Sequence, residues 1–127
     1  MSYFLIALGG ALGALARFLI AQFMAKYVCY TFPCGTLTVN IVGSFFITLF
    51  MVFFISSSVD PLWRLFFVVG FLGAFTTLSS ITYDTIIFLK EGSYFLAFLN
   101  LFSNLFFSLF AGFVGLVLGK VLFLKGG

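Results

Sequence analysis

Charged residues are the scarcest class in this sequence. Of its 127 residues, 6 are Lys or Arg and 3 are Asp or Glu, whereas 64% are hydrophobic. Soluble domains carry roughly a quarter charged residues, so this chain has too few to cover a globular surface. Apolar side chains can face outward as well as inward only where lipid is the solvent. The sequence therefore predicts an integral membrane protein with the lipid bilayer as its surroundings.

Histidine is absent and cysteine is rare, which excludes most site chemistry. Without His there is no imidazole ligand, general base or proton relay, and no nucleophile–base pair or cofactor motif is found. We therefore predict that the chain is not an enzyme. Cys29 and Cys34 could form a disulfide or half of a metal site, but these two alone cannot build a closed zinc site. We expect them to be two small residues at a helix–loop junction.

Four long apolar stretches fill the sequence, at about 3–27, 35–55, 62–89 and 94–123. Each is longer than the roughly 20 residues that a membrane-spanning helix needs. The connections between them are short and have turn compositions, so no soluble domain is expected. The first stretch lacks a basic flank and a clear cleavage site, so we interpret it as a retained span. The predicted fold is an all-α, four-span membrane domain over residues 1–127.

The cationic residues are scattered, which excludes a nucleic-acid surface and leaves the orientation weakly determined. With an even number of spans, Arg64, Lys120 and Lys125 share one side of the membrane, and Lys26 and Lys90 lie on the other. The positive-inside rule needs a clearer bias than this. Either the chain inserts in both orientations or a few charges decide weakly. If both occur, an antiparallel dimer would reproduce the inverted repeats of larger transporters.

Polar residues deep in the first two spans are candidates for function. Gly9, Gly13 and Arg17 share a helical face, and the glycine pair predicts close contact with another helix. An intramembrane Arg is costly, so Arg17 is either functional or reaches an interface from a tilted helix. In the second span, Asn40 must also find partners. Its amide either bonds neighbouring helices or donates to an anion in a pore.

The third span carries the strongest signal. Gly70 and Gly73 precede five hydroxyl residues within seven positions, namely Thr76, Thr77, Ser79, Ser80 and Thr82. Such residues compete for backbone groups, and Gly weakens a helix, so a break is predicted. Carbonyls freed by a break can coordinate a cation. The alternative is a continuous helix whose hydroxyls bond back to the preceding turn.

The few acidic residues favour an anion as the transported ion. Asp60 and Glu91 fall in connections, Asp84 lies near the end of the third span, and the first span has no acid. Cation channels and proton-coupled pumps usually need carboxylates inside the membrane. In the fourth span, Asn104 and Ser108 extend a polar stripe that a run of glycines continues as a helix-packing seam.

Three segments resemble the small bacterial fluoride channel family known as Fluc or CrcB. They are residues 10–18, reading GALGALARF, residues 35–45, reading GTLTVNIVGSF, and residues 70–77, reading GFLGAFTT. Ser108 and the glycines of the fourth span match more loosely. The resemblance covers essentially the whole chain, and the second and third segments are specific to the family.

The resemblance implies more than the composition does. Family members are dual-topology, antiparallel homodimers with two pores, which passively export fluoride across the bacterial cytoplasmic membrane. A sodium ion lies at the dimer centre, and by motif match the backbone carbonyls of Gly73 and Thr76 would hold it. The same match implies a fluoride pathway and, in the first motif, Arg17. The pathway residues would be Asn40, Thr77, Ser79, Ser80 and Ser108.

The sequence departs from the family at two pathway positions. Leu78 and Ile81 stand where relatives have Phe residues whose ring edges line the pathway, and aliphatic side chains offer no such edge. The chain is therefore half of a heterodimer with a related subunit, carries engineered substitutions, or conducts at reduced rate through Leu and Ile. A further departure is Asn104, where many relatives have an aromatic residue.

Two other functions compete with a fluoride channel. A small four-span exporter of drugs or cations has the right size but needs an acid in its first span, which this chain lacks. A non-conducting or weakly conducting subunit of a heteromeric channel remains open because of Leu78 and Ile81.

Overall fold

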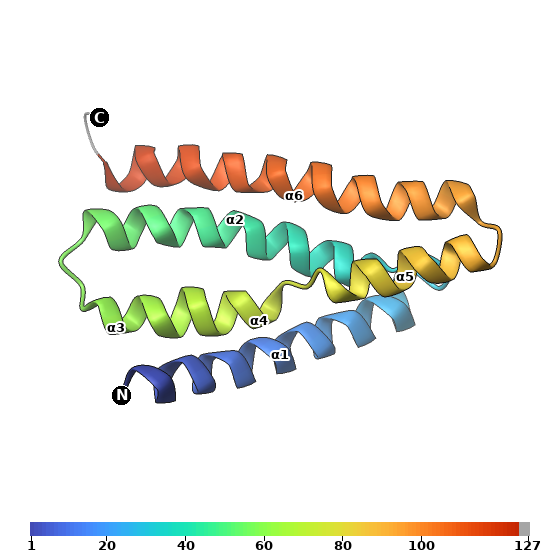
Figure 1. Cartoon of the computed structure of the whole chain (residues 1–127). Coiled ribbons are helices and arrows are strands. Elements are labelled where there is room, and N and C mark those ends of the chain that lie inside the picture. Colours follow the sequence, from blue (N-terminus) through green and yellow to red (C-terminus); the bar gives the residue numbers. More distant parts are fainter. Residues whose placement is uncertain (125–127) are drawn as a thin grey trace.

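The computed structural model describes residues 1–124, and helices account for most of them (Figure 1). The helices are α1 (Ser2–Tyr27), α2 (Cys34–Ser56), α3 (Pro61–Arg64), η1 (Leu65–Leu72), α4 (Gly73–Phe75), α5 (Ser79–Lys90) and α6 (Tyr94–Phe123). Helices α3 to α5 together make the third span. The four predicted spans are confirmed, each boundary to within one residue. Lys125, one of the cationic residues that bear on the orientation in the membrane, lies outside the described residues.

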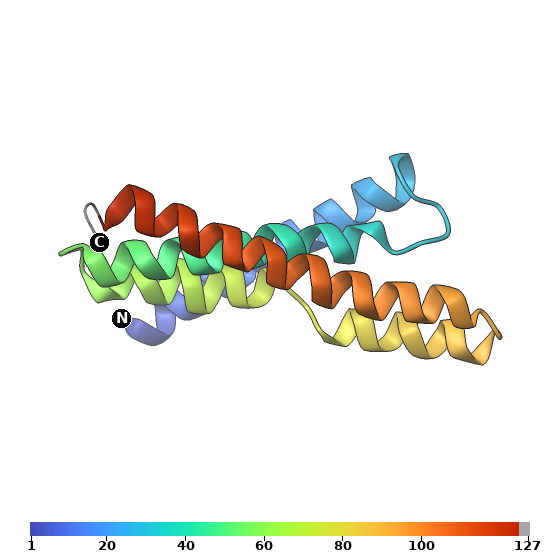
Figure 2. The ribbon, with the colours of Figure 1, turned by 90° about the horizontal axis from the view of Figure 1, so that it is seen from above.

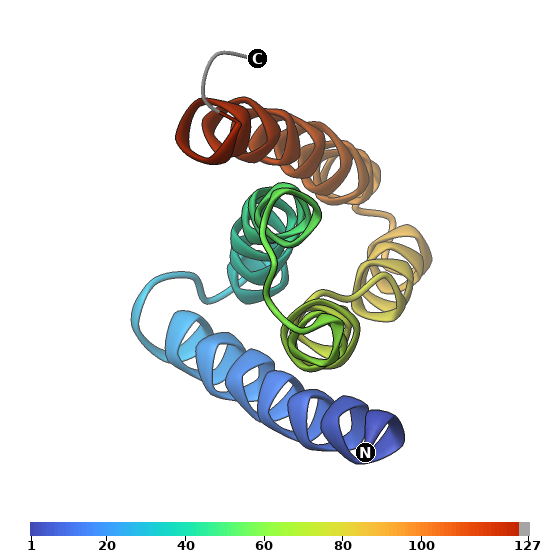
Figure 3. The same cartoon turned by 90° about the vertical axis from the view of Figure 1, so that its left-hand side faces the viewer.

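The spans alternate in direction, so the start of α1 and the end of α6 lie at the same end of the molecule (Figure 1). Helix α2 packs along α6, and α1 packs along η1. Seen end-on, α2 lies between α1 and α6 (Figure 3). From above, α5 and α6 diverge from the second half of α1 toward the end that carries the α1–α2 connection (Figure 2).

Large apolar side chains cover the outside of this bundle. Phe95 and Phe113 are 73% and 63% exposed, and they belong to a long series of such residues on α6. The buried core within one chain is small, centred on Val39, Leu72 and Phe75. Four helical segments within residues 1–124 are long and apolar enough to cross a membrane. Exposed apolar side chains on helices of this length are typical of a multi-pass membrane protein.

Glycines let the helix backbones approach one another. A Cβ atom on Gly9 or Gly13 of α1 would collide with the Phe66 or Phe71 carbonyl of η1. On α6, a Cβ on Gly115 would collide with the Phe45 carbonyl of α2. Both glycine faces predicted from the sequence are confirmed as helix-packing surfaces.

Two features of the structure were not predicted from the sequence, the helical register of residues 65–72 and a disulfide. Residues Leu65–Leu72 form a π-helix, in which hydrogen bonds span five residues instead of four. No residue type marks this change of register, so the sequence did not predict it.

Cys29 and Cys34 form a disulfide with Cα atoms 6.0 Å apart, so the expectation of two unbonded small residues is wrong. Because α1 and α2 are antiparallel, the short connection folds back and brings the two cysteines within bonding distance.

The contrast between Gly13 and Gly10 gives a test of the α1–η1 contact. We expect Gly13→Ala to lower the stability of the protein by about 1–3 kcal/mol, because the new methyl group overlaps the Phe71 backbone. Gly10→Ala is the matched control, since its nearest neighbour would be the Gly70 carbonyl at 3.8 Å. Thermal unfolding in detergent measures both, and equal melting temperatures for the two variants would contradict the packing described here.

Candidate functional site

The third span is broken between α4 and α5. Thr76 has an extended backbone, with φ −86° and ψ 159°, and helix resumes at Ser79. The predicted break is confirmed, and the alternative of a continuous helix is wrong. Two hydroxyls do bond back as that alternative required, since Thr76 and Thr82 donate to the carbonyls of Leu72 and Leu78, each at 3.1 Å. These bonds do not keep the helix continuous.

The break leaves backbone carbonyls without donors, among them those of Gly73 and Thr76. In a continuous helix, Gly73 and Thr76 would accept from the N–H groups of Thr77 and Ser80. Here the Thr77 N–H donates to Asn40 Oδ1 at 2.8 Å, and the Ser80 N–H donates to Thr77 Oγ1 at 3.2 Å. No other donor within residues 1–124 replaces them. The two carbonyls that the family resemblance assigns to a cation are thus among those left free at the break.

Side chains from other helices bind the neighbouring carbonyls. Arg17 Nε donates to the Ala74 carbonyl at 3.0 Å, and Asn40 Nδ2 donates to the Thr77 carbonyl at 3.1 Å. Arg17 is therefore directed at the break, and the alternative in which it reaches a membrane interface is wrong. Its guanidinium places a positive charge beside the break.

Asn40 connects three parts of the fold. Its amide bonds both the N–H and the carbonyl of Thr77, and it also donates to Asn104 Oδ1 on α6 at 3.0 Å. Only 6% of Asn40 is exposed. The interpretation of Asn40 as a residue that bonds neighbouring helices is confirmed, while its place in an ion pathway stays a prediction.

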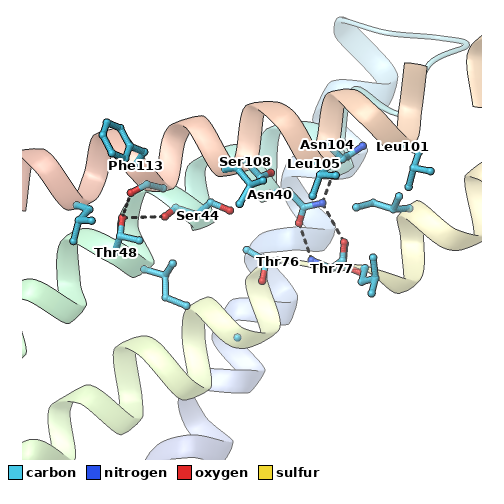
Figure 4. A pocket seen from close by; sticks show the side chains of 17 residues that line it. Asn40, Ser44, Thr48, Thr76, Thr77, Leu101, Asn104, Leu105, Ser108 and Phe113 are labelled. Atoms are coloured by element: carbon cyan, nitrogen blue, oxygen red, sulfur yellow. Dashed lines mark hydrogen bonds between the residues drawn. The ribbon is translucent and has the colours of Figure 1, made fainter. Parts of the chain in front are cut away.

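An open groove of about 770 Å³ lies between α2, the break and α6 (Figure 4). Apolar side chains make up the rest of its lining, and within residues 1–124 no charged side chain lines it. Its polar residues are Asn40, Ser44, Thr48, Thr76, Thr77, Asn104 and Ser108.

The hydroxyl of Ser108 is the unusual polar group of this groove. Its Oγ is buried and has no hydrogen-bond partner within the described residues. By contrast, Thr48 Oγ1 contacts the carbonyl of Gly112 at 2.7 Å. A buried hydroxyl without an acceptor is costly, so Ser108 has an O–H available for a ligand in the groove.

The structure brings together most of the residues that the sequence predicted. The groove is lined by Asn40, Gly73, Thr76, Thr77, Leu78, Ile81 and Ser108. Leu78 is 73% exposed, whereas Ile81 is 8% exposed and packs into the chain.

Three predicted residues do not line the groove. Arg17 contacts the Ala74 carbonyl from α1. The hydroxyls of Ser79 and Ser80 contact Thr77 Oγ1 at 3.1 and 3.5 Å. These two serines belong to the start of α5, where Thr77 caps the helix.

Sequence reasoning missed Ser44 and Thr48, which line the groove on α2. The signal was present, because they follow Asn40 at intervals of four residues and so share its helical face. It also missed the buried role of Asn100, whose Nδ2 donates to Thr85 Oγ1 at 3.0 Å.

The arrangement suits a small anion better than a cation within the groove. Its side chains offer O–H and N–H donors in apolar surroundings without carboxylates, and such donors bind anions strongly where water is excluded. The free carbonyls of Gly73 and Thr76 at the break have the opposite preference, since carbonyl oxygens coordinate cations.

Comparison with known proteins agrees with this geometry. Residues 4–116 match the family described as "CrcB-like protein, Camphor Resistance (CrcB)". A protein of Sulfurihydrogenibium sp. (strain YO3AOP1), named a fluoride-specific ion channel, is 47% identical over 94% of this chain and 98% of its own length. One of Thermosipho melanesiensis with the same name is 42% identical over 98% of this chain and 100% of its own. The chain belongs to the CrcB-like family.

Proposed function

We propose that this protein is a subunit of a passive, fluoride-selective ion channel. The observation that carries the proposal is the buried Ser108 hydroxyl, which has no partner and faces a groove free of charged side chains within residues 1–124. An unpaired buried donor costs about 1–3 kcal/mol, and a small anion in the groove would supply the missing acceptor. The names of the relatives support fluoride as that anion.

Fluoride fits the groove because it is a small and strong hydrogen-bond acceptor. It must exchange its hydration shell for donors in the protein, and the groove offers the unpartnered hydroxyl of Ser108, with the Ser44 hydroxyl and the Asn40 amide also in its lining. Leu78 and Ile81 contribute only apolar surface. Selectivity over chloride would therefore depend on the hydroxyl and amide donors.

We further propose that two copies assemble as an antiparallel, dual-topology dimer in the bacterial cytoplasmic membrane. The groove is open on one side, and a second copy would close it. Each chain brings two free carbonyls, those of Gly73 and Thr76, and two from each copy would make a carbonyl-lined site. These residues fit a sodium ion, which would supply a fixed positive charge at the dimer centre. A related subunit in place of the second copy is the alternative.

Fluoride efflux from liposomes that contain only this chain tests the proposed function. We expect rapid release of fluoride and little release of chloride under the same gradient. Equal release of both ions would contradict a selective fluoride channel. No release from protein that is folded and dimeric would show that this chain alone does not form the channel, and co-reconstitution with a related subunit would then test the heterodimer.

Replacing Ser108 with Ala tests the donor that carries the proposal. We expect fluoride flux to fall by about ten-fold or more, because a hydrogen bond to a charged group contributes about 1.5–3 kcal/mol. The control is Ser103→Ala on the same helix, whose hydroxyl is buried but contacts only the Asn100 carbonyl, at 3.4 Å. If both variants retain full flux, Ser108 does not donate to the conducted ion.

The two cysteines offer a test of dual topology without introduced residues. Cys29 and Cys34 are the only cysteines in the chain, and both lie at the α1–α2 connection. After reduction, a membrane-impermeant maleimide added to intact spheroplasts should label about half of the chains, because the connection then faces either side. Permeabilised cells should be labelled completely. Labelling of all chains, or of none, in intact cells would indicate a single orientation.

A further inference from the structure

The chain has three asparagines, and all of them belong to one buried hydrogen-bonded network. Asn100, Asn104 and Asn40 are 0%, 2% and 6% exposed. Asn100 and Asn104 lie one turn apart on α6, and Asn40 faces them from α2 (Figure 4 shows the bond between Asn40 and Asn104). A buried amide is costly unless it is bonded, so the pattern of bonds within this network is restricted.

The orientation of the Asn104 amide follows from its neighbours. Its Nδ2 group donates to the Asn100 carbonyl at 2.7 Å and to Asn100 Oδ1 at 3.2 Å. Asn100 Nδ2 in turn donates to Thr85 Oγ1 on α5 at 3.0 Å, which leaves Asn100 Oδ1 as the acceptor. With both acceptors on its Nδ2 side, Asn104 must present its oxygen to Asn40.

Both N–H groups of the Asn40 amide are therefore occupied within one chain. Its two hydrogens are directed at the Thr77 carbonyl, at 3.1 Å, and at Asn104 Oδ1, at 3.0 Å. Its oxygen accepts from the Thr77 N–H at 2.8 Å. An anion can gain an N–H from Asn40 only by displacing one of these acceptors. The Thr77 backbone is paired with Asn40 through both its N–H and its carbonyl. Asn104 contacts Asn40 through a single bond and borders the groove.

We propose that Asn104 is a built-in competitor for the anion, an acceptor that occupies one Asn40 N–H until fluoride replaces it. This inference rests on the proposed function and adds a positioning residue to it. A neutral amide oxygen is a weaker acceptor than an anion, so replacing Asn104 Oδ1 by fluoride on the Asn40 N–H is favourable. The gain in free energy is smaller than it would be if that N–H had no partner to lose. Asn104 thereby weakens fluoride binding at Asn40 and shortens its stay, which conduction requires.

Side-chain amide signals test this inference directly. Protein labelled only with ¹⁵N-asparagine has three labelled side-chain NH₂ groups. The signal that is lost in Asn104→Leu is that of Asn104. We expect fluoride to shift the Asn40 signal in the wild type. In Asn104→Leu the shift should be half complete at about five-fold lower fluoride, the factor that one ordinary hydrogen bond contributes. Maximal fluoride flux should fall in the same variant, because the ion leaves more slowly.

Ser103→Ala is the control, as a buried neighbour on α6 that does not contact Asn40. If Asn104→Leu does not fold, Asn104→Ser serves the same test, because its hydroxyl is shorter and can still donate to the Asn100 carbonyl. If the protein conducts fluoride but the Asn40 signal depends on fluoride equally in wild type and variant, the inference about Asn104 is overturned. The proposed function would still stand. A wild type that neither conducts nor shows a fluoride-dependent Asn40 signal would overturn the proposed function itself.

Discussion

At membrane depth, an unpaired peptide group has no water to bond and costs several kcal/mol, so a break in the third span is favoured where other groups replace some of the lost partners. The amide of Asn40 does this by pairing with both the N–H and the carbonyl of Thr77, at 2.8 and 3.1 Å. Arg17 does the same for the Ala74 carbonyl from α1. The rest of the structure depends on these contacts, because they hold α2 and α1 against a break that would otherwise be unstable.

The same contacts determine which groups are left for ions. Since Thr77 donates to Asn40 and Ser80 donates to Thr77 Oγ1, the carbonyls of Gly73 and Thr76 keep no donor within the described residues. Across the groove, Ser108 keeps an unused hydroxyl. The break thus places carbonyl acceptors close to a groove with O–H and N–H donors. A cation and an anion could be bound near one another with little mutual cost, since their opposite charges attract.

The sequence predicted the features that depend on local composition, but it did not predict which residues contact one another. Four spans follow from apolar length, and the break follows from two glycines before a run of hydroxyls, because both are local properties. The disulfide depended on how the α1–α2 connection folds back, which a spacing of five residues leaves open. Asn100 looked like any polar residue on α6, and only the position of α5 gives it Thr85 as a partner. The π-helical register of η1 has no residue type to mark it.

Hydrogen bonds within the chain distinguish the polar groups that stabilise the fold from those that can bind the ion. Asn40 has three bonds within the chain, so any substitution there removes support from the break and also a donor from the groove. A loss of flux at Asn40 alone therefore cannot distinguish misfolding from loss of an ion contact. Ser108 has no bond within residues 1–124, and its hydroxyl can be removed without leaving another group unpaired. The polar atoms left over when the fold is complete are consequently the sharper indicators of the ion pathway.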